Sequence, residues 1–133
     1  MDYRLVTLKA DGITERQIIW MQYSLSQQTD VEGQPVGRTR GGKIKLRVIT
    51  PKDGNTDIIS WMCDMTASKN GTITIPALGG GDLKTIIFKD GFVVEYSETY
   101  DRDKTTVLIE EFTISAKKIR IGSAIHDNNW SLE

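Results

Sequence analysis

The sequence predicts a mainly β fold, an antiparallel β-barrel or β-sandwich with one short flanking α-helix. Several short segments alternate apolar with polar residues, which is the pattern of strands that bury one face. Gly, Pro, Asn and Asp separate these segments, and only one segment has the apolar spacing of a helix. The chain has 133 residues, 38% hydrophobic and 26% charged, so we expect one domain with one core over residues 1–133.

The first half of the chain carries three predicted strands and a long loop. The first strand covers residues 3–9 and ends at the turn formers Asp11 and Gly12. The second strand follows that turn, and the third, over residues 43–49, alternates apolar residues with Lys and Arg. Between these two lies a polar loop over residues 27–42 that contains four glycines. Loops of this length are uncommon in compact domains and are commonly functional or disordered.

The single predicted helix covers residues 56–65. Asn55 or Thr56 can cap its start, and an acidic first turn suits the positive end of the helix dipole. Because so short a helix is marginal alone, it must pack on the sheet. The residues predicted to pack it there lie on or beside one apolar face: Ile58, Trp61, Met62 and Met65. Trp61 either anchors the helix to the barrel end or, if it is exposed, belongs to an assembly contact.

Turn signals divide the next part of the chain. A tight turn at Asn70-Gly71 is predicted before a strand over residues 72–75. Asp90-Gly91 is the strongest hairpin signal in the sequence, and we expect it to join strands over residues 85–89 and 92–100.

The last predicted strand region covers residues 107–121. Its buried face changes parity after Lys117-Lys118, which indicates a bulge or a corner. A tail over residues 122–133 follows, and His126 lies in it, near an end of the chain that we expect to be mobile.

Charge is segregated along the chain. Residues 38–52 hold six basic residues and no acid, whereas residues 90–111 hold seven acids against two basic residues. Two edges of opposite charge let copies dock head to tail, which generates rings or filaments, and the alternative is two solvated strand faces. The candidate subunit-contact residues are Lys43, Lys45, Arg47, Glu95, Glu98 and Glu110. The net charge of −1 argues against a nucleic-acid partner.

The sequence offers no set of catalytic or metal-binding residues. His126 and Cys63 are the only histidine and cysteine, too few for a zinc site or a Ser-His-Asp arrangement. We therefore expect no enzyme, no cofactor and no metal. The N-terminal residues lack the basic and apolar regions of a signal peptide, and no run of about 18 apolar residues predicts insertion into a membrane.

A family resemblance extends over nearly the whole chain. The stretches that carry it occur in order at residues 23–30, 33–35, 40–46, 60–62, 93–98, 113–119 and 126–130. Together they resemble the type VI secretion tube proteins of Bacteroidetes, the TssD or haemolysin-coregulated protein (Hcp) family. Gln34 stands where the family pattern suggests a basic residue, and Asp90-Gly91-Phe92 replaces a less turn-like tripeptide.

The resemblance implies a β-barrel with a flanking helix, related to phage tail tube proteins and assembled as a hexameric ring. Rings of this family stack into a tube inside a contractile sheath, the tube is tipped by a VgrG spike, and its lumen can carry effectors. Such a protein lies in the cytoplasm before firing and is then secreted without a signal peptide. The loop over residues 27–42 would contact the next ring and become ordered only there. The implied stacking residues are Thr29, Asp30, Glu32, Gln34, Pro35, Arg38 and Arg40.

Three alternatives stay open. A phage-like or other contractile injection tube protein is the nearest one. A monomeric β-barrel that binds a small ligand belongs to another class, and it should enclose an apolar cavity rather than form a ring with a wide polar hole. For the loop alone, a tolerated surface insertion is the alternative to a stacking contact.

Overall fold

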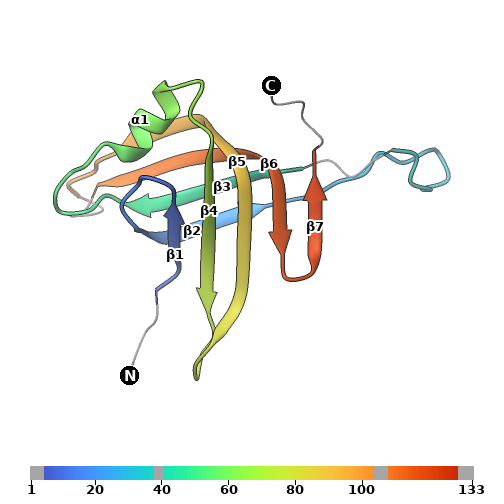
Figure 1. Cartoon of the computed structure of the whole chain (residues 1–133), viewed down its shortest axis with the longest axis horizontal. Coiled ribbons are helices and arrows are strands. Elements are labelled where there is room, and N and C mark those ends of the chain that lie inside the picture. The colour runs from blue at the N-terminus through green and yellow to red at the C-terminus, as the bar shows by residue number, and fades with distance from the viewer. Residues whose placement is uncertain (1–4, 38–40, 104–107, 129–133) are drawn as a thin grey trace.

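The chain folds into a closed antiparallel β-barrel with one short helix against it (Figure 1). The computed structural model describes residues 5–37, 41–103 and 108–128. Its elements, in chain order, are β1 (Thr7–Ala10), β2 (Arg16–Tyr23), β3 (Lys43–Ile49), α1 (Asp57–Cys63), β4 (Lys69–Pro76), β5 (Asp82–Thr99), β6 (Ile109–Ile121) and β7 (Ala124–Asp127). The strands follow the order β3-β2-β1-β4-β5-β6, and a β3–β6 pairing closes the barrel while β7 pairs with the end of β6.

The alternating pattern of the sequence places the core inside the barrel. On β3 the side chains of Ile44, Leu46 and Val48 are fully buried, and the basic residues between them are exposed. Burying each such side chain contributes roughly 1.5–3 kcal/mol. The other buried apolar residues are Leu8, Ile18, Ile58, Trp61, Ile73, Ile86, Phe88, Val93, Phe112, Ile114, Ala116 and Ile119. The predicted barrel and its third strand are therefore confirmed.

The predicted hairpin at Asp90-Gly91 is wrong, because β5 runs through this dipeptide as one continuous strand of 18 residues. Asp90 has φ 53°, and its N–H donates to Oδ1 of Asn70 at 3.0 Å. Gly91 pairs with Ala116 on β6, and a Cβ here would lie 2.9 Å from the side chain of Ile114. Asp90 thus provides a positive φ, and Gly91 provides close packing, for a bend inside β5. A hairpin cannot form here because β5 is paired with β4 on one side and with β6 on the other.

The turn predicted at Asn70-Gly71 is also wrong, because both residues lie inside β4. A Cβ on Gly71 would approach the Cζ atom of Phe88 to 2.4 Å and the carbonyl oxygen of Lys9 to 2.8 Å. Glycine is needed here because the ring of Phe88 lies against the backbone of β4.

The predicted parity change on the last strand is confirmed, and β5 changes with it. Ala116 and Ile119 are both buried on β6, as are Phe88 and Val93 on β5, so neither strand keeps a strict two-residue alternation. The pairing of the two strands holds its register across this place, from Phe88 opposite Ile119 to Val93 opposite Ile114. The two strands therefore bend together, as Figure 1 shows, and turn the barrel wall through a corner.

The helix is shorter than predicted and packs with fewer residues. Ile58 and Trp61 are buried, and the Trp61 Nε1–H donates to the carbonyl oxygens of Ala67 at 3.0 Å and Gly91 at 3.1 Å. Trp61 is thus a core anchor for α1 against β5. Met62 is exposed, and Met65 is 88% exposed beyond the last helical residue. The predicted packing roles of these two methionines are wrong, because a helix of two turns presents only one i, i+3 pair to the barrel.

The part of the chain that the structure describes contains no helix with the length and hydropathy needed to cross a membrane.

Candidate functional site

The loop between β2 and β3 projects from the barrel as a small hairpin of its own (Figure 1). Thr29 and Pro35 form an antiparallel bridge, and the N–H of Asp30 donates to the carbonyl oxygen of Gln34 at 3.0 Å. The Asp30 carboxylate accepts two further bonds, from the N–H groups of Glu32 at 2.9 Å and Gln34 at 3.0 Å. These bonds within one chain give the hairpin its form, whereas we expected order only on contact with a partner.

The hairpin offers its whole length to solvent. Every residue from 24 to 37 is exposed, and the side chain of Val31 at the tip is exposed completely, between Asp30 and Glu32. The predicted stacking residues Thr29, Asp30, Glu32, Gln34 and Pro35 all lie on this hairpin, whereas Arg38 and Arg40 lie outside the described residues. The structure therefore gathers the described candidates at one projecting surface.

The base of the hairpin is held by a residue that the sequence analysis did not single out. The Asn128 amide Nδ2 donates to the carbonyl oxygens of Gly41 at 3.1 Å and Ala116 at 3.0 Å, and Oδ1 lies 2.8 Å from Nε2 of His126. His126 is buried on β7, and the end of the chain expected to be mobile, residues 129–133, lies outside the described residues. Only pairing of β7 with β6 brings Asn128 to Gly41, and nothing in the local sequence signals that contact.

The basic residues of β3 meet an acid of the same chain. Because β3 pairs with β6, Lys45 Nζ lies 3.1 Å from one carboxylate oxygen of Glu111 and Arg47 Nε lies 2.9 Å from the other. The hydrogen bonds from Lys45 and then Arg47 lower the pKa of the Glu111 carboxyl. The segregated charges of the sequence are thus partly paired within one chain. Lys43, Glu95 and Glu98 are exposed on β3 and β5.

The prediction that Glu110 makes a subunit contact is wrong, because its side chain is buried inside the barrel. Its Oε2 accepts from Arg16 Nη1 at 2.6 Å and from the Thr50 hydroxyl at 2.8 Å, and its Oε1 accepts from the Tyr96 hydroxyl at 2.7 Å. Burial and then the bond to Glu110 raise the pKa of Tyr96. Adjacent strand residues point to opposite faces, so Glu110 points inside while Glu111, which is half-buried, lies on the outer face.

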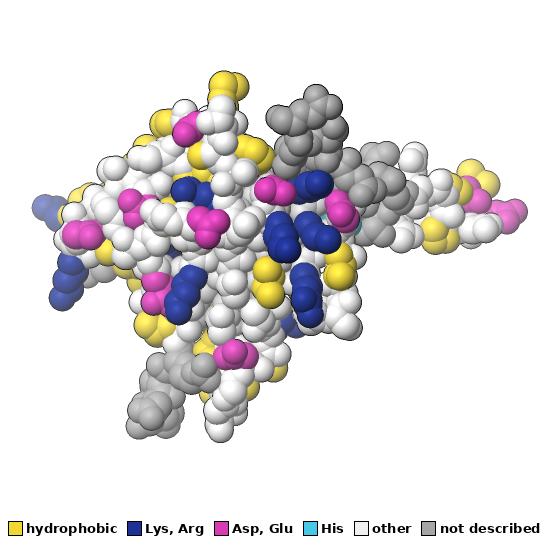
Figure 2. Space-filling view, in the orientation of Figure 1, with side chains coloured by type: hydrophobic (Ala, Val, Ile, Leu, Met, Phe, Trp, Pro, Cys, Tyr) yellow, Lys and Arg dark blue, Asp and Glu magenta, His cyan; other side chains and the backbone are white. Residues whose placement is uncertain are grey.

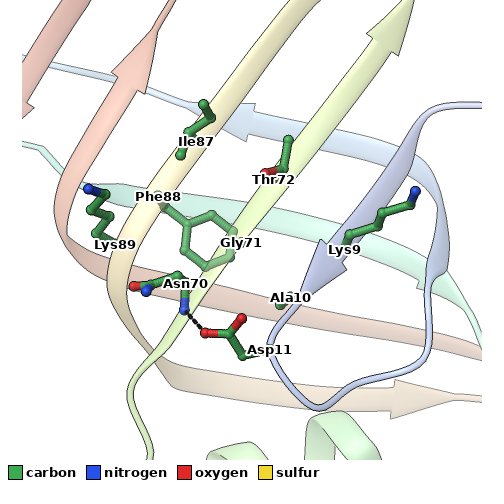
Figure 3. Close-up of a pocket in the computed structure, with 9 residues that line it drawn as sticks. All are labelled: Lys9, Ala10, Asp11, Asn70, Gly71, Thr72, Ile87, Phe88 and Lys89. Atoms are coloured by element: carbon green, nitrogen blue, oxygen red, sulfur yellow. Dashed lines mark hydrogen bonds between the residues drawn. The ribbon is translucent and has the colours of Figure 1, made fainter.

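The surface hollows do not assemble a reactive centre in the described part of the chain. One hollow, with a volume of about 350 Å³, lies between β1, β4 and β5. Figure 3 shows the ring of Phe88 at Gly71, with Lys9 and Lys89 on opposite sides and the dashed bond from Asn70 to Asp11 below. Among the described residues no three of His, Cys, Asp and Glu are grouped as metal ligands.

Comparison with known proteins identifies the family. Residues 4–131 match the family model described as Hemolysin coregulated protein Hcp (TssD). The solved structure of Hcp1 from Flavobacterium johnsoniae is 32% identical, with a TM-score of 0.83 over 94% of this chain and 100% of that one. Comparison with curated proteins gave no match.

Two more distant structures share the fold. Hcp1 from E. coli EAEC 042 superposes with a TM-score of 0.73 at 12% identity over 95% of this chain and 99% of that one. A chain in the sheath–tube complex of an extracellular contractile injection system, PVC, has a TM-score of 0.58 at 16% identity over 90% of this chain and 89% of that one. The fold is thus shared with a chain of a contractile injection system. The chain belongs to the Hcp (TssD) family, whose members are structural tube proteins and not enzymes.

Proposed function

We propose that this protein is the inner-tube protomer of a type VI secretion system. Six copies form a ring, rings stack into a tube inside a contractile sheath behind a VgrG spike, and the lumen carries secreted effectors. The protein lies in the cytoplasm until firing expels it. The observation that supports this most directly is the match to Flavobacterium Hcp1 over all of that chain at 32% identity.

The projecting hairpin supports stacking of one ring on the next. It extends away from the barrel, and its internal hydrogen bonds preorganise it. A preorganised segment loses less conformational entropy on binding than a disordered one, so more of its contact energy appears as affinity. The exposed charges at Lys43, Glu95 and Glu98 remain our proposed contacts for ring closure, with Lys45 and Arg47 contributing outside their bonds to Glu111.

Ring formation and stacking are tested separately by altering the hairpin. In one variant residues 29–39 are shortened to a Gly-Ser turn, and in a matched variant they become a Gly/Ser segment of unchanged length. Native mass spectrometry should find hexamers for both, because the barrel strands are untouched. Electron microscopy and a secretion assay should find neither tubes nor export. A shortened protein that still stacks and is exported would make the hairpin a tolerated surface insertion.

A monomeric ligand-binding barrel predicts a different solution size. In the part of the barrel that the structure describes, the interior is packed with core side chains such as Leu46, Phe112 and Ile114, which argues against an apolar ligand cavity there. Light scattering that gives the mass of one chain at all concentrations would favour that function over a ring. A different contractile injection tube would also form rings, and co-purification with type VI rather than other sheath components distinguishes the two.

A further inference from the structure

We propose that the hairpin tip of one copy, Asp30-Val31-Glu32, docks into a basic hollow on the outer face of β5, β6 and β7 of a second copy. This inference rests on the proposed function, and it specifies the surface to which the hairpin of an assembling protomer binds. The hollow is lined by Ile87, Lys89, Lys118, Arg120 and Ile125 and has a volume of about 330 Å³.

The strand register brings the lining residues together. Ile87 lies opposite Arg120, and Arg120 lies opposite Ile125, so these three form one cross-strand row. Lys89 lies opposite Lys118 in the next row on the same face. Figure 2 shows Lys and Arg side chains gathered over β5, β6 and β7, with hydrophobic side chains between them. The hollow therefore has three cations around two isoleucines.

This arrangement is unfavourable in an isolated protomer. Like charges directly opposite each other on neighbouring strands destabilise a sheet, and Lys89 and Lys118 are such a pair. Arg120 Nε donates to the carbonyl oxygen of Gly122, and Asp127 lies opposite Lys118, so this acid borders the group of cations. Ile125 keeps 61% of its surface exposed. An acidic partner with an apolar centre would relieve both the repulsion and the exposure.

The hairpin tip has that chemistry. Val31 is fully exposed between two acidic residues, and Asp30 is fixed in the turn by its bonds to two N–H groups. An inserted Val31 would contact Ile87 and Ile125, and the flanking carboxylates would meet the surrounding cations. Figure 2 shows acidic and hydrophobic side chains together on the projecting segment. The tip thus presents one apolar residue between two acids, and the hollow presents apolar residues among basic ones.

The occupant must be a second copy. All residues from 24 to 37 are exposed, so the tip does not cover the hollow of its own barrel. The tip and the hollow are different surfaces of one molecule, and such head-to-tail contacts repeat from copy to copy. Repetition makes even a modest contact effective, since every copy in an assembly contributes one. The stacking residues implied by the sequence include the acids Asp30 and Glu32 as well as Arg38 and Arg40, and the contact with the hollow uses the two acids.

A charge exchange tests the contact. Glu32→Lys and Lys118→Glu should each raise the concentration at which stacked species form by about tenfold or more, and should weaken the salt dependence. The two changes in one chain should restore stacking, because each copy then presents a basic tip and an acidic hollow. Lys52→Glu, at an exposed residue beyond β3, makes the same change in charge and should neither block stacking nor rescue Glu32→Lys.

A crosslink tests the geometry. In a Cys63→Ser background, Val31→Cys with Ile125→Cys should give an oxidised ladder of covalent oligomers. Val31→Cys with Leu78→Cys is the control, because Leu78 is also almost fully exposed but lies outside the hollow.

The outcomes separate the two proposals. Hexamers that stack without a specific Val31–Ile125 crosslink, and with Glu32→Lys stacking like the parent, would overturn the inference and leave the proposed function standing. A single chain that neither assembles nor crosslinks would overturn both.

Discussion

Removing the buried carboxylate of Glu110 should be among the most destabilising single changes in this protein. Glu110→Gln keeps the size of the side chain but removes the charge that compensates Arg16, whose side chain is fully buried. The carboxylate accepts three hydrogen bonds at 2.6 to 2.8 Å, and an amide has only one oxygen to accept them. Breaking one partner of a buried ion pair costs about 3–5 kcal/mol, which lowers Tm by roughly 10–20 °C in a chain of this size.

The assay is urea unfolding followed by tryptophan fluorescence, with all variants at one protein concentration because assembly shifts apparent stability. Glu111→Gln is the matched control, since it changes the neighbouring residue in the same way on the outer face, and should cost under about 1 kcal/mol. Arg16→Met combined with Glu110→Leu should recover most of the loss, because no charge is then left buried. Equal costs for Glu110→Gln and Glu111→Gln would refute the assignment of Glu110 to a buried ion pair.

Three further predictions use the same assay. Trp61→Ala should cost roughly 3–5 kcal/mol, because the indole is buried, whereas Met65→Ala should stay within about 0.5 kcal/mol; a reversed order would contradict the packing of α1. The folded-state pKa of Glu111 is lowered, so its contribution is present above the ordinary value of 4.5 and is lost as pH falls below it. Glu111→Gln should therefore make the free energy of unfolding depend less on pH on the acid side. An unchanged pH dependence would show that the ion pairs of Glu111 with Lys45 and Arg47 do not contribute to stability. Gly71→Ala should cost about 1–3 kcal/mol or more, because the added methyl group meets the Phe88 ring, and a neutral effect would mean that the ring moves aside freely.

The barrel could be predicted from sequence where one physical signal dominates. The alternation on β3 specifies a strand with one buried face, and the parity change at Lys117-Lys118 specifies a corner. Asp90-Gly91 misled because the same backbone freedom serves a two-residue hairpin and a bend inside a strand. The bend is selected only by β4 and β6, which pair with the two sides of β5. Local propensity does not encode pairing between segments that are distant in the chain.

The candidate surfaces were predictable in position more than in chemistry. The sequence predicted a long polar loop after β2 but not its hairpin form, because the bridge between Thr29 and Pro35 depends on a turn fixed by one carboxylate. The charge of Glu110 pointed to the surface, since charged residues are seldom buried, and its partner Arg16 lies 94 positions away. The hollow at Ile125 needs three strands in register before it exists.

The pairing of β3 with β6 closes the barrel during folding, and its register has to be specified by the side chains of the two strands. This pairing joins residues far apart in the chain, so it forms against a large loop-closure entropy, and several registers compete. A slip of one residue would turn every side chain of β6 to the opposite face of the sheet, so Phe112, Ile114 and Ala116 would leave the apolar interior. A slip can exchange one glutamate for the other, but it cannot keep these three apolar side chains buried, so the apolar face of β6 specifies the register in which the barrel closes.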